Sequence, residues 1–163
     1  MKPSQNCIEL IKAFEGMYLK AYPDPGTKDD PIKKGKPFTI GYGTVRYPNG
    51  KEVMPGDTCT KEEAEKYLMH ELEEKARGVS KLVTVPLNQD QTDAILSMVY
   101  NIGLHAFETS TLLGYINLSR FADASAQFLR WTKANGKVLP GLERRRKCES
   151  ALFLSLDWRR FLT

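Results

Sequence analysis

Apolar residues recur at helical spacing along most of the chain, with one stretch that departs from this pattern. Near the N-terminus, Ile8, Ile11 and Phe14 are spaced to lie on one face of a helix. In residues 18–22 and 38–47, aromatic and β-branched residues are instead interrupted by Gly and Pro, which predicts a small sheet. The pattern changes once, and this change indicates two lobes.

After residue 60 the chain is helical in pattern throughout. Thr60 and Glu63 form a Thr-x-x-Glu capping box, which predicts a long helix from about residue 61 to about residue 77. Asn88 can cap the next helix, and Gly103 closes it. Further helices are predicted in three segments, near residues 111–117, 120–131 and 142–154.

These elements predict an α+β fold that is predominantly helical. A small N-terminal lobe with a short β-sheet, about residues 15–60, should be joined by the long helix to a helical lobe at about 78–163. The first helix, residues 4–14, should pack on that second lobe, and we expect an active-site cleft between the lobes. A chain of 163 residues, 41% of them hydrophobic, can bury the core of one such domain, residues 1–163.

Charge and cysteine content exclude several kinds of protein. A formal net charge of +4 is too small to indicate nucleic-acid binding, but it favours approach to an anionic surface such as a bacterial cell wall. Cys7, Cys59 and Cys148 are odd in number and lack metal-ligand spacing, so we expect reduced thiols and no zinc site. Residues 1–10 are too polar for a signal peptide, and no window reaches the roughly 18 consecutive apolar residues that a membrane span needs. We therefore expect no signal peptide, signal anchor or stable membrane insertion.

Two carboxylates and one hydroxyl stand out in the first lobe. Glu15 ends the first helix before Gly16, Asp24 lies between two prolines, and Thr39 opens the segment Thr39-Ile40-Gly41-Tyr42-Gly43. Two carboxylates and a water-orienting hydroxyl are the parts needed to cleave a glycosidic bond. Taken singly, a Glu before Gly is commonly just a helix end, and an Asp between prolines is commonly a turn former.

Together these residues resemble the phage-type lysozymes, glycoside hydrolase family 24. The family pattern is a helix-ending Glu, an Asp after eight intervening residues, and a Thr that opens a Thr-Ile-Gly strand; Glu15, Asp24 and Thr39 fit it. The resemblance covers most of the chain, because it continues in three later segments: Gln91-Thr92-Asp93-Ala94-Ile95-Leu96-Ser97, Asn101-Ile102-Gly103 and Gly141-Leu142-Glu143-Arg144-Arg145-Arg146.

The chain departs from the family at two places. Between Asp24 and Thr39 it has fourteen residues, Pro25 to Phe38, where shorter members have far fewer. This loop is charged and has hardly any apolar residue to anchor it, so we expect it to be mobile and solvated. After Thr-Ile-Gly-Tyr-Gly the family usually has His, whereas this chain has Thr44, so no His-dependent ion pair is expected.

The resemblance implies a role for each site residue. Glu15, against the apolar wall that Phe14 helps to form, would stay protonated by desolvation and donate a proton to the leaving oxygen. Asp24, which stays ionised, would activate a water that Thr39 holds on the opposite face of the sugar. The resemblance also implies inversion of the anomeric centre, and neither a metal nor another cofactor.

Further residues are placed at the cleft by the resemblance alone. Val45 would face it from the first lobe, and Tyr100 and Asn101 from the second, where aromatic faces and amides suit sugar rings. Tyr100 could equally belong to the core. Arg145 best fits the family's arginine that packs near the catalytic Glu, although solvated charge remains the simpler interpretation of the run Arg144-Arg145-Arg146.

The sequence thus predicts an endolysin muramidase that hydrolyses the β-1,4 bond between N-acetylmuramic acid and N-acetylglucosamine in peptidoglycan glycan strands. Two alternatives stay open: a lytic transglycosylase, which needs the acid but no water-activating base, and a wall-binding spike or toxin component. We expect a monomer that binds no nucleic acid. It should remain in the host cytoplasm until a separate holin-like pore opens a lesion through which it reaches the periplasm.

Overall fold

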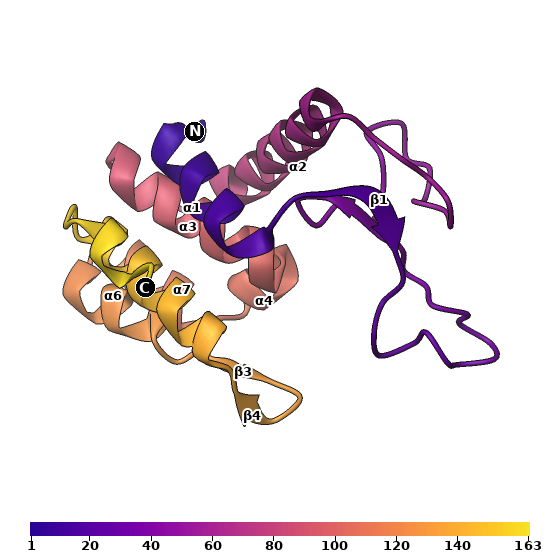
Figure 1. Ribbon diagram of the computed structural model, residues 1–163. Helices are drawn as coiled ribbons and strands as arrows, with labels where there is room; N and C mark the ends of the chain where they lie inside the picture. The colour runs from indigo at the N-terminus through magenta and orange to yellow at the C-terminus, as the bar shows by residue number, and fades with distance from the viewer. The chain divides into compact units, whose positions relative to one another are not determined.

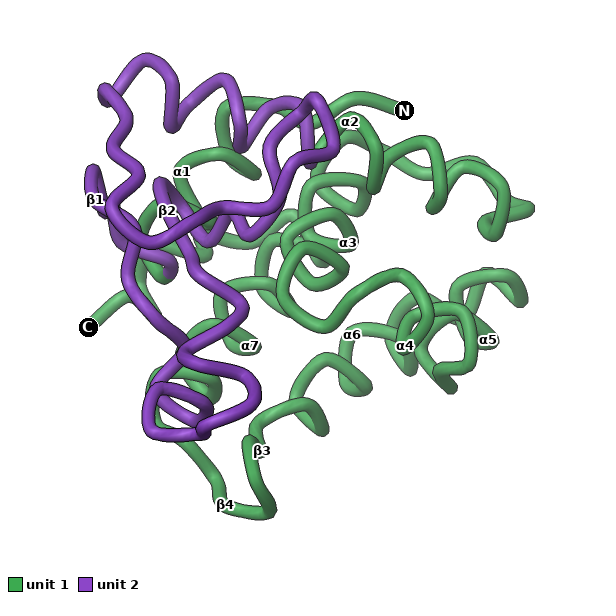
Figure 2. Tube along the Cα trace, turned by 90° about the vertical axis from the view of Figure 1, so that its right-hand side faces the viewer, with its two compact units in different colours: residues 1–14, 72–163 green, residues 15–71 purple.

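The computed structural model describes residues 1–163 and contains seven α-helices, one short 3-10 helix and two small antiparallel sheets (Figure 1). The predominantly helical α+β fold expected from the sequence is confirmed. The chain divides into two compact units (Figure 2). The smaller unit comprises residues 15–71, and the larger unit combines residues 1–14 with residues 72–163.

The smaller unit contains the sheet of β1 (Tyr18–Tyr22) and β2 (Thr39–Gly41), which run antiparallel. The first strand lies where it was predicted. The second is much shorter than the predicted 38–47, because Gly41 and Gly43 adopt positive φ angles of 64° and 95°. The amide of Thr44 then donates to the Ile40 carbonyl at 2.9 Å, so the chain turns back directly after β2.

Helix α1 (Gln5–Glu15) follows directly after Ser4, whose hydroxyl accepts a hydrogen bond from the Asn6 amide at 3.2 Å. It ends at Gly16, where φ is +67°. This left-handed conformation costs glycine little and other residues more, so Gly16 stops the helix immediately after Glu15. The acid is thereby placed at a helix terminus.

Helix α2 (Lys61–Leu82) starts with the predicted capping box: the Glu63 amide donates to Thr60 Oγ1 at 3.1 Å, and the Thr60 amide to Glu63 Oε1 at 3.0 Å. Its predicted end at residue 77 is wrong. The helix continues through Gly78, where a Cβ would come within 2.4 Å of Leu104 Cδ2. This glycine is needed for close packing rather than for chain reversal.

Helix α3 (Gln89–Ile102) is the buried centre of the larger unit, since residues 91–99 are all buried. Asn88 and Gln91 form a complete capping box, with bonds of 2.8 and 2.9 Å, and the Gly103 amide closes the helix by donating to the Val99 carbonyl at 2.8 Å. Both predicted ends are confirmed.

The elements that follow α3 along the chain complete the larger unit. They are α4 (Leu104–Glu108), α5 (Thr111–Asn117), α6 (Phe121–Phe128), β3 (Lys133–Ala134), β4 (Lys137–Val138), α7 (Pro140–Phe153) and the 3-10 helix η1 (Trp158–Phe161). Helix α7 packs against α3, α6 and η1, and α5 packs against α6. The three predicted helices are present, although α6 ends at Phe128 and not at 131. No helix combines the length and the apolar character that crossing a bilayer requires.

Candidate active site

The three residues singled out for catalysis all belong to the smaller unit. Glu15 is the last residue of α1, Asp24 follows β1 by two positions, and Thr39 is the first residue of β2. All three side chains are half-buried. The strand register places Thr39 directly opposite Tyr22, the last residue of β1. Thr39 therefore lies beside the end of the strand that Asp24 follows.

Tyr22 connects these residues, and the sequence argument missed it. Its hydroxyl is hydrogen-bonded to the hydroxyl of Thr39. Burial raises the pKa of Tyr22, as do the neighbouring Tyr18 and the negative charges of Glu15 and Asp24, while the bond to Thr39 acts in the opposite direction. Because charge effects weaken with separation, Tyr22 lies within electrostatic reach of both carboxylates.

A signal for Tyr22 was present in the sequence. Alternate residues of a strand share a face, so Tyr18 and Tyr22 lie on the same side of β1. Their ring centroids are 4.6 Å apart in a tilted arrangement. The alternation could have placed both tyrosines beside the site, whereas the pairing with Thr39 depends on the strand register.

Asp24 is held by the ends of the long loop that follows it. Its amide donates to the Gly35 carbonyl at 2.9 Å, and its Oδ1 accepts from the Gly26 amide at 2.7 Å. These bonds fix the backbone and one carboxylate oxygen. The second oxygen, Oδ2, makes no hydrogen bond within the protein, so it is available to a water.

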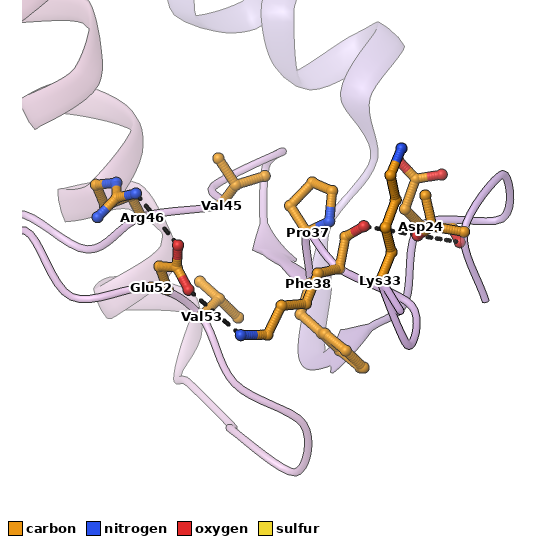
Figure 3. A pocket seen from close by; sticks show the side chains of 10 residues that line it. Asp24, Lys33, Pro37, Phe38, Val45, Arg46, Glu52 and Val53 are labelled. Atoms are coloured by element: carbon orange, nitrogen blue, oxygen red, sulfur yellow. Dashed lines mark hydrogen bonds and ion pairs between the residues drawn. The ribbon is translucent and has the colours of Figure 1, made fainter. Parts of the chain in front are cut away.

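Asp24 also lines a pocket of about 450 Å³ in the smaller unit (Figure 3). The structure brings Asp24 and Val45 together there, and Val45 is 40% exposed. The other lining residues are charged, polar or apolar: Thr27, Lys33, Lys36, Pro37, Phe38, Arg46, Glu52 and Val53. On one side, Glu52 pairs with Arg46 at 3.4 Å and with Lys36 at 3.7 Å.

Tyr100, Asn101 and Arg145 lie in the larger unit. Tyr100 is half-buried and Asn101 is exposed, both near the end of α3. Asn101 Oδ1 accepts a hydrogen bond from the Arg146 guanidinium, so this amide helps to hold α7 against α3. The structure thus gives Asn101 a packing role that its sequence did not indicate.

The expectation that the arginine run is solvated charge is wrong for two of its three members. Arg145 is 3% exposed and Arg146 is fully buried. Both contact Glu149, which is fully buried, at 3.1 and 2.6 Å respectively, and Arg145 also donates to the Ser97 carbonyl at 3.1 Å. The cause is the acid three and four positions further along α7, which allows both cations to be buried.

No group of three or more His, Cys, Asp and Glu side chains is arranged to hold a metal ion. The three cysteines are buried free thiols. Burial raises the pKa of Cys148 to about 11 and also raises the pKa values of Cys7 and Cys59. None of the three is therefore a reactive thiolate near neutral pH.

Comparison with known proteins identifies the family of the chain. Residues 12–149 match the model of the family described as Phage lysozyme. The chain belongs to this family. It is 43% identical over 155 residues to the endolysin of Bacillus phage B103, covering 95% of this chain and 55% of that one. The chain therefore spans about half the length of that relative.

Two other relatives match over nearly their whole length. The endolysin of Salmonella phage P22 is 42% identical over 155 residues, with 95% of this chain and 99% of that one covered. The solved muramidase domain of SpmX from Asticaccaulis excentricus superposes with a TM-score of 0.79 at 36% identity, covering 94% of this chain and 97% of that one.

Proposed function

We propose that this member of the Phage lysozyme family is an endolysin muramidase. It hydrolyses the β-1,4 bond between N-acetylmuramic acid and N-acetylglucosamine in peptidoglycan. The observation that carries this proposal is that two carboxylates and one threonine hydroxyl lie in one unit of a phage lysozyme fold, with the half-buried Tyr22 directly opposite Thr39 in the strand register. The endolysin and muramidase names of the relatives support it.

In the proposed reaction Glu15 gives its proton to the leaving glycosidic oxygen as the bond to the anomeric carbon breaks. Asp24 Oδ2 takes a proton from a water whose oxygen attacks that carbon from the opposite face. Thr39 orients the water, and the bond to Tyr22 restrains the Thr39 hydroxyl. Because the water attacks directly, the product forms with the α configuration.

Other contacts with the substrate remain predictions. Val45 lines the pocket beside Asp24, which supports its contact with the glycan strand. We also propose that Tyr100 and Asn101 contact the strand and that Arg145 supports the site through the packing of α7. The protein is proposed to act as a monomer, without a cofactor, after a separate holin-like pore releases it from the host cytoplasm to the periplasm.

A first test removes the proton donor. Glu15→Gln keeps the side-chain shape but cannot donate, so turbidity clearance of permeabilised Gram-negative cells should fall by roughly 10²–10⁴-fold. Glu73→Gln, an exposed glutamate of α2, is the matched control and should keep full activity. Circular dichroism should show both variants folded. If Glu15→Gln kept more than about a tenth of the activity, the proposed acid would be wrong.

The alternative of a lytic transglycosylase is separated by the products. That enzyme needs no water, so it would leave anhydro-muramic ends, which mass spectrometry of the digested wall detects. Following the anomer by NMR during early turnover tests the water mechanism. A first-formed α product agrees with attack by water, and a β product would require Asp24 to attack the anomeric carbon itself.

A further inference from the structure

The pocket beside Asp24 is lined by more cationic side chains than anionic ones. Lys33, Lys36 and Arg46 line it, and besides Asp24 it contains a single carboxylate, that of Glu52. Lys36 and Arg46 share this carboxylate, and Figure 3 shows the pair of Arg46 with Glu52 on one side of the pocket. The Lys33 ammonium has no ion-pair partner. The pocket therefore has an excess of cations over anions.

We propose that this pocket binds a carboxylate group carried by a substituent of the glycan strand, with Lys33 as its main partner. The inference rests on the proposed function, because the strand reaches the pocket only if Asp24 acts at the scissile bond. Asp24 is itself one of the residues that line the pocket, so a substituent on a sugar held at Asp24 would lie beside it.

The construction of the loop keeps Lys33 available for such a group. Asp30 is the nearest acid in the sequence, yet its Oδ1 accepts from the amides of Ile32 at 2.8 Å and Lys33 at 2.9 Å. These bonds lower the pKa of Asp30, so it stays ionised and committed to the backbone. The acid thus shapes the turn that presents the Lys33 side chain.

The size and walls of the pocket agree with this ligand. A volume of about 450 Å³ lies within the roughly 300–1,000 Å³ of ordinary small-molecule sites. Apolar side chains provide surface for the aliphatic part of a substituent: Pro37, Phe38, Val45 and Val53. A further bond, from Thr27 Oγ1 to the Lys36 carbonyl at 2.6 Å, holds the loop that forms the rim.

Two groups of peptidoglycan could supply the carboxylate. The lactyl ether of N-acetylmuramic acid ends in a free carboxylate when the stem peptide is absent. When the peptide is present, the lactyl group is an amide, and the acidic side groups of the peptide carry the charge. Both sources share one chemistry, so the substrates of the test must distinguish them.

The test compares Lys33→Gln and Lys33→Glu with the wild type on three uncross-linked strands. The first strand keeps its acidic stem peptides, the second has the peptide carboxylates amidated, and the third has no peptide and a free lactyl carboxylate. Initial rates give kcat and KM for each at low and at moderate salt. Lys28→Gln is the matched control, since Lys28 is exposed on the same loop but does not line the pocket.

We expect Lys33→Gln to raise KM about 2–5-fold on at least one acid-bearing strand, and Lys33→Glu to raise it further, with kcat unchanged. The effect should shrink with salt and be absent on the amidated strand. A higher KM of the Lys33 variants on the first strand assigns the carboxylate to the peptide. A higher KM on the third strand assigns it to the lactyl group. Equal KM values for Lys33→Glu and wild type on all three strands would overturn the inference, while a wild type inactive on every strand would instead overturn the proposed function.

Discussion

At the scale of single residues, Thr39 shows how a neighbouring side chain can orient a hydroxyl in a site. A threonine hydroxyl has one donor and two acceptor positions and rotates freely unless a neighbour restrains it. The bond to Tyr22 provides that restraint, because Tyr22 is itself fixed by the strand pairing and by its ring contact with Tyr18. The remaining positions of the Thr39 hydroxyl can then serve one water.

Tyr22→Phe should therefore reduce turnover while leaving substrate binding intact. The ring and its packing remain, and loss of one hydrogen bond worth about 0.5–1.5 kcal/mol should lower kcat about 2–12-fold with KM within about twofold. Steady-state kinetics on soluble glycan strands measures both. In a Thr39→Ala background the same change should have little further effect, because the two residues act through one hydroxyl.

The control for this prediction is a second tyrosine hydroxyl in the same unit. Tyr47 donates to Asp57 Oδ2 at 2.7 Å, away from the residues assigned to catalysis. Tyr47→Phe should lower the melting temperature but leave kcat unchanged. Full additivity of Tyr22→Phe and Thr39→Ala would show that Tyr22 does not act through Thr39.

At the residue scale, the sequence carries mainly local information. Glu15, Asp24 and Thr39 are marked by neighbouring residues and by spacing, and the structure places them in one unit. Tyr22 was missed because its role depends on pairing across a long loop, which sequence alternation cannot fix. Burial of Arg145 was missed because a run of like charges does not reveal which acid faces it.

At the scale of elements, helix starts were predicted better than helix ends. A cap is a bond between residues three positions apart, as Thr60 with Glu63 and Asn88 with Gln91 illustrate. An end depends on distant packing, and the predicted end of α2 at about residue 77 falls short of its actual end at Leu82. The β3–β4 hairpin was missed although Asn135 and Gly136, both with positive φ, form the usual two-residue turn signal.

The loop of residues 25–38 is expected to show uneven hydrogen exchange. The amides of Lys34 and Gly35 donate to the carbonyls of Asp30 and Thr27, both at 2.8 Å, whereas Lys28 and Asp29 lie exposed with no such bond. Exchange measured by NMR should be slower at the first pair than at the second, and faster than in buried α3. A loop without internal order would show no such contrast.

A single substitution provides a second test of order in this loop. Thr27→Val removes the bond from Thr27 Oγ1 to the Lys36 carbonyl while keeping the branched shape. Exchange at Gly35 should then accelerate, since the two bonds close the same turn. Uniform protection as strong as that of α2 would mean that the loop is packed, and the expected solvated loop would be wrong.

At the scale of the whole molecule, the larger unit is held together by a polar centre as well as an apolar one. Glu149 on α7 accepts from Ser97 Oγ on α3 at 2.7 Å, and both buried arginines of α7 contact it. Removing a carboxylate from such a cluster leaves buried guanidinium groups facing a neutral neighbour. The penalty for breaking buried ion pairs of this kind is about 3–5 kcal/mol.

Glu149→Gln should consequently lower the free energy of unfolding by about 3–5 kcal/mol, measured by urea denaturation. Glu73→Gln, which is exposed on α2, should change it by less than about 0.5 kcal/mol. Because Arg145 is proposed to support the site only through the packing of α7, kcat of the Glu149→Gln fraction that stays folded should remain near that of the wild type at low temperature. A variant that stays fully stable yet loses turnover would instead assign this cluster to catalysis, and would make Arg145 the first residue to examine.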